Sequence, residues 1–144
     1  MLRQLASFAA AALALGGIFA PQPAFSADPI SIQVDPGVCA EQRYLGRIVS
    51  RFDYQVRHVP NLPQVGIESF YNITERRYEP TDDWHPISRR YCTADVVLSD
   101  GQRRDIDYLI ETDMGFASIG NSVEFCVEGF DRWYVYNGGC RVLK

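Results

Sequence analysis

Residues 91–110 read YCTADVVLSDGQRRDIDYLI, and this stretch decides the fold. Apolar and polar residues alternate in both halves, which is the period of two expected of half-buried β-strands. Between the halves lies Ser99-Asp100-Gly101-Gln102, a run of turn-forming residues. The stretch therefore predicts an antiparallel hairpin with strands at residues 91–98 and 104–110.

The register of this hairpin depends on the length of its turn. A two-residue turn at Asp100-Gly101 would place Val96 opposite Asp105, so that an apolar side chain faces a charge. A three-residue loop that also includes Ser99, with Gly101 left-handed and a bulge, shifts the pairing by one residue. We predict this loop, which pairs apolar residues across the strands: Ala94 with Ile106, and Cys92 with Tyr108.

One amphipathic helix is expected upstream of the hairpin. Asp35 can accept hydrogen bonds from the first free amides of a helix, and Pro36 suits the first helical position. Pro60 and Pro63 follow, so the helix should end near His58. Its apolar residues recur at spacings of three and four and form one stripe: Leu45, Ile48, Val49, Phe52, Val56 and Val59.

The exposed side of this helix carries a row of arginines. Arg43, Arg47 and Arg51 stand four residues apart, so they line one stripe and repel one another weakly. They need acidic partners, which could be carboxylates of the sheet or of another protein.

Two more regions carry strand patterns. Apolar residues alternate with polar ones over residues 65–76, where Phe70 is the one apolar residue on the polar side. A loop with two prolines over residues 78–88 separates this strand from the hairpin. A last hairpin is expected near the C-terminus, with strands at residues 123–128 and 133–136.

The order of elements predicts an α+β domain. A short extended segment at residues 30–34 precedes the helix, which would pack on a four- to five-stranded antiparallel meander. This order resembles the cystatin-like architecture, and the resemblance implies, by analogy of fold alone, inhibition of a cysteine protease. The chain departs from the Gln-x-Val-x-Gly loop of cystatins, because its nearest string, Gln64-Val65-Gly66, precedes the first long strand.

The N-terminus predicts export. Arg3 is followed by the apolar run 5–20, which is shorter than the roughly 20 residues of a membrane helix. Cleavage after Ser26, with Ala24 at position −3, fits a signal peptidase. We therefore expect a cleaved signal peptide at residues 1–26 and one periplasmic or secreted domain at residues 27–144, with no membrane insertion after cleavage.

Four cysteines predict two disulfides, because an even number in a small exported domain favours oxidation. The closest pair is separated by thirteen residues, too many for a zinc knuckle. Cys92 lies on the apolar face of its strand, and Cys39 in the first helical turn faces the same core. Cys126 lies opposite the apolar face of its own strand. We therefore pair Cys39 with Cys92, and Cys126 with Cys140.

Charge and motifs narrow the function classes. Without the signal peptide, 13 basic and 18 acidic residues leave a formal net charge of −5, which argues against nucleic acid as a partner. The chain has no phosphate-binding loop, nucleophile elbow, paired-histidine helix or Cys-x-x-Cys. The sequence therefore predicts no cofactor and no bound metal.

One polar cluster could support catalysis. Asp82, Asp83 and His85 could hold a divalent ion or act as acid and base, so a hydrolase or metal-dependent enzyme is the alternative function. Adjacent aspartates in a loop more often turn or cap the backbone, which is the simpler interpretation. Asp105 and Asp107 alternate along a strand and are expected to lie on a solvated face.

The C-terminal hairpin is the candidate partner-binding site. Along its second strand, Trp133 and Val135 share one face and Tyr134 and Tyr136 the other, so one aromatic set faces outward unless something covers it. With Phe130 and Arg132 they would bind a protein or carbohydrate of the cell envelope. A satellite core beneath the second disulfide is the alternative. The predicted function is a small exported binding or inhibitor-type module.

Overall fold

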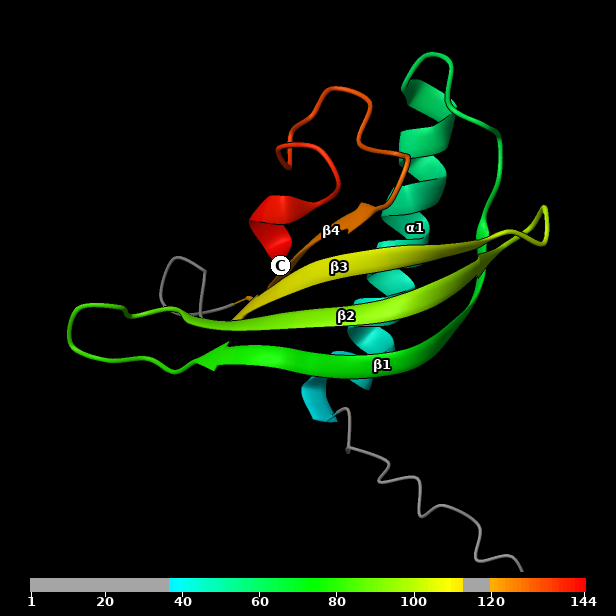
Figure 1. The fold of residues 1–144 in the computed structure, drawn as a ribbon. Helices are drawn as coiled ribbons and strands as arrows, with labels where there is room; N and C mark the ends of the chain where they lie inside the picture. Colours follow the sequence, from blue (N-terminus) through cyan, green and yellow to red (C-terminus); the bar gives the residue numbers. More distant parts are fainter. Residues whose placement is uncertain (1–36, 113–119) are drawn as a thin grey trace, which may run out of the picture. The chain divides into compact units, whose positions relative to one another are not determined.

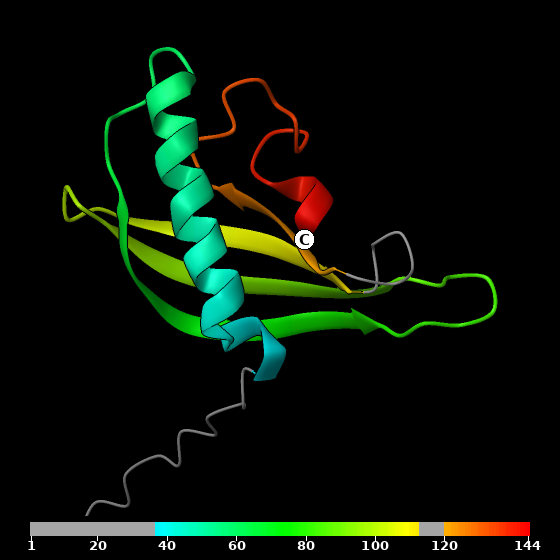
Figure 2. The ribbon, with the colours of Figure 1, turned by 180° about the vertical axis from the view of Figure 1, so that it is seen from behind.

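The computed structural model describes residues 37–112 and 120–144, so the predicted signal peptide, the segment 30–34 and the helix start at Asp35-Pro36 lie outside the described residues. The described elements follow one another in the order η1 (Gly37–Ala40), α1 (Gln42–His58), β1 (Ile67–Glu79), β2 (Ser88–Leu98), β3 (Arg103–Thr112), β4 (Ser122–Val127) and η3 (Arg141–Leu143). The strands form one antiparallel sheet in the order β1-β2-β3-β4, and α1 crosses one of its faces (Figures 1 and 2). The α+β class is therefore confirmed.

The helix ends where the sequence predicts and begins later. The Val59 N–H donates to the carbonyl oxygen of Gln55, and Pro60 follows. The start of the helix differs from the prediction, because Cys39 lies in the short 3₁₀ helix η1 and not in the first turn of α1. Gly37 has a φ of +50° and Glu41 is extended, and neither conformation fits within a continuous α-helix.

The apolar stripe of α1 packs on the sheet and forms the main core. Its buried residues meet the inward side chains of β2, β3 and β4, and the Cys39–Cys92 disulfide lies within this cluster, with an S–S distance of 2.03 Å. The Tyr108 hydroxyl donates to the Cys39 carbonyl oxygen at 2.7 Å, which ties η1 to the centre of the sheet. The predicted pairing of these two cysteines is confirmed.

The register of the β2–β3 hairpin is also confirmed. Ala94 pairs with Ile106 and Cys92 with Tyr108. Gly101 has a φ of +79°, the left-handed conformation that favours glycine, and its N–H donates to the Leu98 carbonyl oxygen at 2.8 Å.

An irregularity in β1 explains the position of Phe70. The register of β1 against β2 shifts between Ile67 and Ser69, and Phe70 then pairs with Val96, whose side chain is fully buried. Phe70 consequently packs against the main core, while the neighbouring Tyr71 is 48% exposed. A shift of one residue exchanges the faces of a strand, which the simple alternation of the sequence does not show.

A smaller apolar cluster lies on the sheet face opposite α1. Cys126 and Cys140 form the second disulfide, with an S–S distance of 2.08 Å, as predicted. They pack with Leu109 of β3 and Leu143 of η3, and Tyr136 covers the cluster in part. The C-terminal segment is thereby fixed to the outer half of the sheet.

Within the described ranges, no helix has the length and apolar character needed to cross a membrane.

Candidate functional site: the groove beside strand β4

A groove of about 410 Å³ lies between the second half of α1, strand β4 and the segment that follows β4. This volume is within the range of ligand-binding pockets. The lining residues come from these three parts: Arg51 and Gln55 of α1 with Val59 directly after it, residues 123–127 of β4, and residues 130–133, 135 and 136 of the loop. The groove thus brings three of the four predicted aromatic residues, all except Tyr134, together with residues of the helix.

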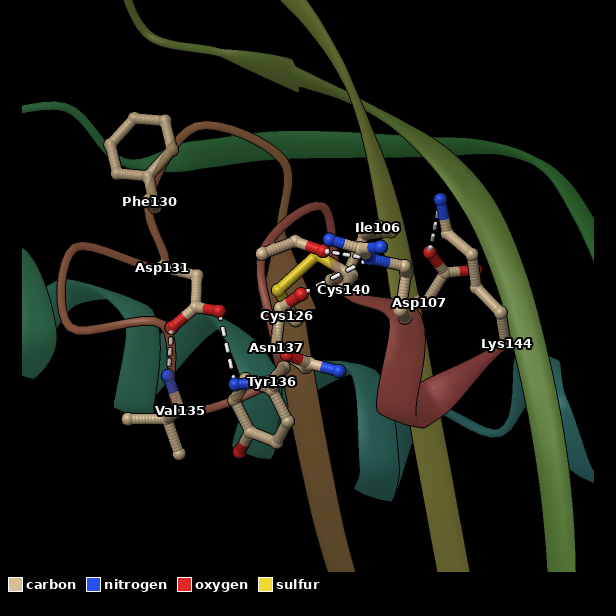
Figure 3. Close-up of a disulfide and its surroundings, with 12 residues drawn as sticks. Ile106, Asp107, Cys126, Phe130, Asp131, Val135, Tyr136, Asn137, Cys140 and Lys144 are labelled. Carbon is tan, nitrogen blue, oxygen red and sulfur yellow. Dashed lines mark hydrogen bonds and ion pairs between the residues drawn. A yellow bond between two sulfur atoms is a disulfide. The ribbon is translucent and has the colours of Figure 1, made fainter.

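The loop 128–140 has a fixed internal structure. Both carboxylate oxygens of Asp131 accept backbone hydrogen bonds, from the N–H of Val135 at 2.8 Å and of Tyr136 at 3.0 Å (Figure 3). The Tyr134 N–H donates to the Asp131 carbonyl oxygen at 3.1 Å. The Cys126–Cys140 disulfide closes the base of the loop. These bonds hold the segment without a regular strand.

The prediction of a strand at residues 133–136 is wrong, because this segment consists of turns. Tyr134 has a φ of +56° and Asn137 a φ of +61°, and two left-handed residues so close together interrupt the extended backbone of a regular β-strand. The Asp131 side chain occupies the N–H groups that a strand partner would use. The predicted placement of Trp133 and Tyr136 on opposite faces of a strand is therefore also wrong.

The aromatic residues of the loop divide into a buried and an exposed set. Phe130 is 4% exposed and packs edge-on against Phe52 of α1, with ring centroids 4.9 Å apart, so it belongs to the core. Tyr136 is half-buried against the smaller cluster. Trp133 and Tyr134, in contrast, are 65% and 73% exposed. Of the predicted site aromatics, Phe130 therefore belongs to the main core, Tyr136 packs on the smaller cluster, and Trp133 and Tyr134 face outward.

Two more residues complete this surface: Val135, which was not among the predicted site residues, and Arg132, which was. Val135 is 67% exposed, so three consecutive large apolar side chains project from the loop. Arg132 is also exposed and lines the groove.

A row of polar side chains on α1 donates hydrogen bonds to backbone carbonyl oxygens in and around β4. Arg47 and Arg51 each donate, at 2.6 Å, to the backbone carbonyl oxygens of Asn121 and Val123 respectively. Gln55 donates in the same way to the carbonyl oxygen of Phe130 at 3.0 Å.

The arginine row therefore meets its partners in a way that the sequence analysis did not predict. Arg43 does pair with a carboxylate, that of Glu41, at 2.6 Å. Arg47 and Arg51 contact carbonyl oxygens. A spacing of four residues on a helix spans about 6 Å, close to two residues of a strand, so residues 47, 51 and 55 can follow a strand edge.

The Asp82 cluster lies away from this groove, in the loop between β1 and β2. The Asp82 carboxylate accepts from the backbone N–H groups of Trp84 at 2.8 Å and of His85 at 2.7 Å, so it forms the turn. The His85 ring nitrogen Nδ1 lies 3.0 Å from the same carboxylate, and this contact holds the pKa of Asp82 below its ordinary value. Asp83 and Trp84 are exposed, and the described residues contain no group of three or more metal-ligating side chains.

The expectation of a solvated face for Asp105 and Asp107 is half wrong. Asp105 is exposed, but Asp107 is 2% exposed. Its carboxylate lies 3.9 Å from a guanidinium nitrogen of Arg76 and 3.8 Å from Nζ of Lys144, and its Oδ1 has no hydrogen-bond partner within the described part of the chain. Burial raises the pKa of Asp107, although Thr93, Lys144 and Arg76 oppose this effect. The returning C-terminus covers this position.

No protein-family model, curated protein or solved structure matches this chain.

Proposed function

We propose that the protein is a small exported binding module that captures a partner of the cell envelope at the groove beside β4 and its aromatic loop. One observation carries this proposal: Trp133, Tyr134 and Val135 are 65–73% exposed on a loop whose backbone is fixed. Clustered apolar side chains exposed beside a groove mark binding sites, and aromatic residues and arginine are the usual anchors of interfaces.

The fixed loop favours binding because its ordering cost is met during folding. A loop that is already held in one conformation loses little conformational entropy when a partner binds. Tyr134 is held in a left-handed backbone conformation that is unfavourable for a large residue, and such conformations cluster at functional sites. The loop therefore keeps its aromatic side chains projecting at a conformational cost.

Export and an inhibitor-type role belong to the same proposal. The apolar N-terminal run supports export, and the two disulfides are compatible with a periplasmic or extracellular location. The helix followed by an antiparallel meander supports the cystatin-like order, which suggests inhibition only by analogy of fold.

Affinity capture from the native envelope fraction tests the proposal. We expect Trp133→Ala and Tyr134→Asn to weaken capture of the partner, while both variants stay folded. Trp84→Ala is the matched control, because Trp84 is 88% exposed on a different loop. Equal loss of capture with the Trp84 variant, or no loss with either loop variant, would overturn the proposal.

The alternative function, a hydrolase or metal-dependent enzyme, uses Asp82, Asp83 and His85. Its structural support is the contact between Asp82 and His85, which also line a second cavity of about 420 Å³. The triple variant Asp82→Ala, Asp83→Ala and His85→Ala separates the two functions. An enzyme would lose turnover in this variant, whereas the binding module would keep its partner.

A further inference from the structure

The hydrogen-bonding pattern between β3 and β4 shows which backbone groups of β4 point to its outer edge. The Glu128 N–H donates to the Asp105 carbonyl oxygen of β3. In an antiparallel ladder, hydrogen-bonded pairs alternate with non-hydrogen-bonded ones, so every second residue of β4 before Glu128 also bonds to β3 and the residues between them do not. The backbone groups of Val123, Phe125 and Val127 therefore point away from β3. In the described sheet β4 is an outermost strand, so these groups face the groove side.

The carbonyl oxygens on either side of Phe125 along this edge are already occupied. The carbonyl oxygens of Asn121 and Val123 accept from Arg47 and Arg51, and that of Val127 accepts from the Phe130 N–H at 3.0 Å. Proteins commonly cover exposed strand edges, because uncovered edges pair with other chains. Phe125 lies between the occupied positions, and the described residues give its outward N–H and C=O no partner.

This uncovered position lies inside the groove. Residues 123–127 all line the groove, between Arg51 on the helix side and Arg132 on the loop side. A strand partner at this position would find one backbone donor and one backbone acceptor on the same residue. That pair is complementary to the backbone of an extended peptide.

The charges of the groove favour an acidic segment. Two carboxylates line it, but both oxygens of Asp131 already accept backbone N–H groups. Glu124 alternates with Phe125 and so projects with Cys126 toward the sheet face opposite α1. Arg51 and Arg132 form no ion pair with any carboxylate in the described ranges.

We propose that the partner contributes an extended segment that adds to β4 at Phe125, with two backbone hydrogen bonds and an acidic side chain toward Arg51 and Arg132. This inference rests on the proposed function and specifies the chemistry of its partner. A second copy of the chain fits less well, because edge-to-edge pairing would place the arginines of both copies in one groove.

A short synthetic peptide tests this directly. The probe is acetyl-Thr-Val-Glu-Val-Thr-amide, titrated into the ¹⁵N-labelled protein and followed by NMR. We expect the Phe125 amide to shift and its hydrogen exchange to slow. Replacing the central Glu with Gln should weaken binding by roughly two- to fivefold, the range of an exposed ion pair. N-methylation of the peptide amide that faces Phe125 should abolish the effect.

Two variants of the protein provide the matched comparison. Phe125→Pro removes the outward N–H and leaves the β3 ladder bonds in place, whereas Phe125→Ala loses the same ring but keeps the N–H. We expect the Ala variant to bind the peptide and the Pro variant not to. If the Pro variant fails to fold, the N-methylated peptide decides the question with the unmodified protein.

Three outcomes would overturn the inference. The N-methylated peptide could bind as well as its parent, or the shifts could be confined to Trp133 and Tyr134. The Phe125 amide could also shift with protein concentration in the absence of peptide, which would identify a second copy as the occupant. The second outcome would overturn strand addition at Phe125 but would leave the aromatic loop as a binding site. The proposed function itself is tested separately, by affinity capture from the envelope fraction.

Discussion

Tyr134 combines an unfavourable backbone conformation with a side chain that packs on its own loop. The φ of +56° suits asparagine or glycine better than tyrosine, and the ring lies over Gly138, where an added Cβ would meet it at 3.3 Å. We predict that Tyr134→Asn keeps the free energy of unfolding within about 0.5 kcal/mol of wild type. Tyr134→Val should be clearly less stable, because a β-branched residue is poorly accommodated at positive φ. Urea denaturation measures the stability of the two variants, and equal stabilities would contradict a left-handed backbone at Tyr134.

Asp107 gives a prediction about pH. Burial, the largest influence, raises its pKa in the folded state above the ordinary value of 3.8. The folded protein therefore holds this proton at pH values where the unfolded chain has released it. The stabilisation is fully present below pH 3.8 and is lost as the pH rises through the raised pKa.

The neutral variant Asp107→Asn should thus be more stable than wild type at pH 7, with a difference that shrinks as the pH falls. Urea unfolding at several pH values checks this, and Asp105→Asn, at an exposed position on the same strand, is the control. A loss of stability in Asp107→Asn at pH 7 would mean that the contacts with Arg76 and Lys144 outweigh the cost of burial.

At the scale of elements, the loop after β4 combines a core residue with a binding surface. Phe130 is 4% exposed against Phe52, so Phe130→Ala should cost about 3–5 kcal/mol of stability. Trp133→Ala should cost no more than about 0.5 kcal/mol, because that side chain is 65% exposed. Thermal unfolding of the two variants tests the division. A large loss of stability for Trp133→Ala would place this residue in a satellite core.

The elements that could be predicted from the sequence are those fixed by local rules. The β2–β3 register follows from Gly101 and the apolar pairs across the hairpin, and the end of α1 follows from Pro60. The segment 133–136 has the composition of a strand, but the Asp131 side chain folds it into turns, and alternation does not report such bonds.

The parts of the site that escaped prediction depend on contacts between distant segments. Asp107 is buried because the chain returns to place Lys144 beside it, 37 residues later in sequence. The arginine row finds carbonyl oxygens at an edge whose position depends on the whole sheet. The sequence shows that aromatic residues gather near the C-terminus, but their separation into buried and exposed members required the fold.

At the scale of the whole molecule, the described residues form two apolar clusters on opposite faces of one sheet, and each cluster contains one disulfide. The larger cluster joins α1 to the sheet around Cys39–Cys92, and the smaller one holds the C-terminal segment around Cys126–Cys140. Within the smaller cluster, only four residues are buried. The C-terminal segment should therefore open more easily than the helix and sheet, because local stability follows the number of buried apolar contacts.

Removal of the second disulfide should separate binding from folding. In the chain-entropy model, closing its loop of about 15 residues contributes roughly 3 kcal/mol, and the longer loop of Cys39–Cys92 about 4 kcal/mol. We predict that Cys126→Ser with Cys140→Ser keeps the far-ultraviolet circular dichroism of α1 and the sheet but loses capture of the partner, because the loop that projects Trp133 is no longer held. The matched double variant at Cys39 and Cys92 should instead lower the stability of the whole domain. Hydrogen exchange locates the opening: faster exchange confined to residues 128–144 in the first variant is the expected result, and uniform acceleration along the chain would show that the two clusters unfold as one unit.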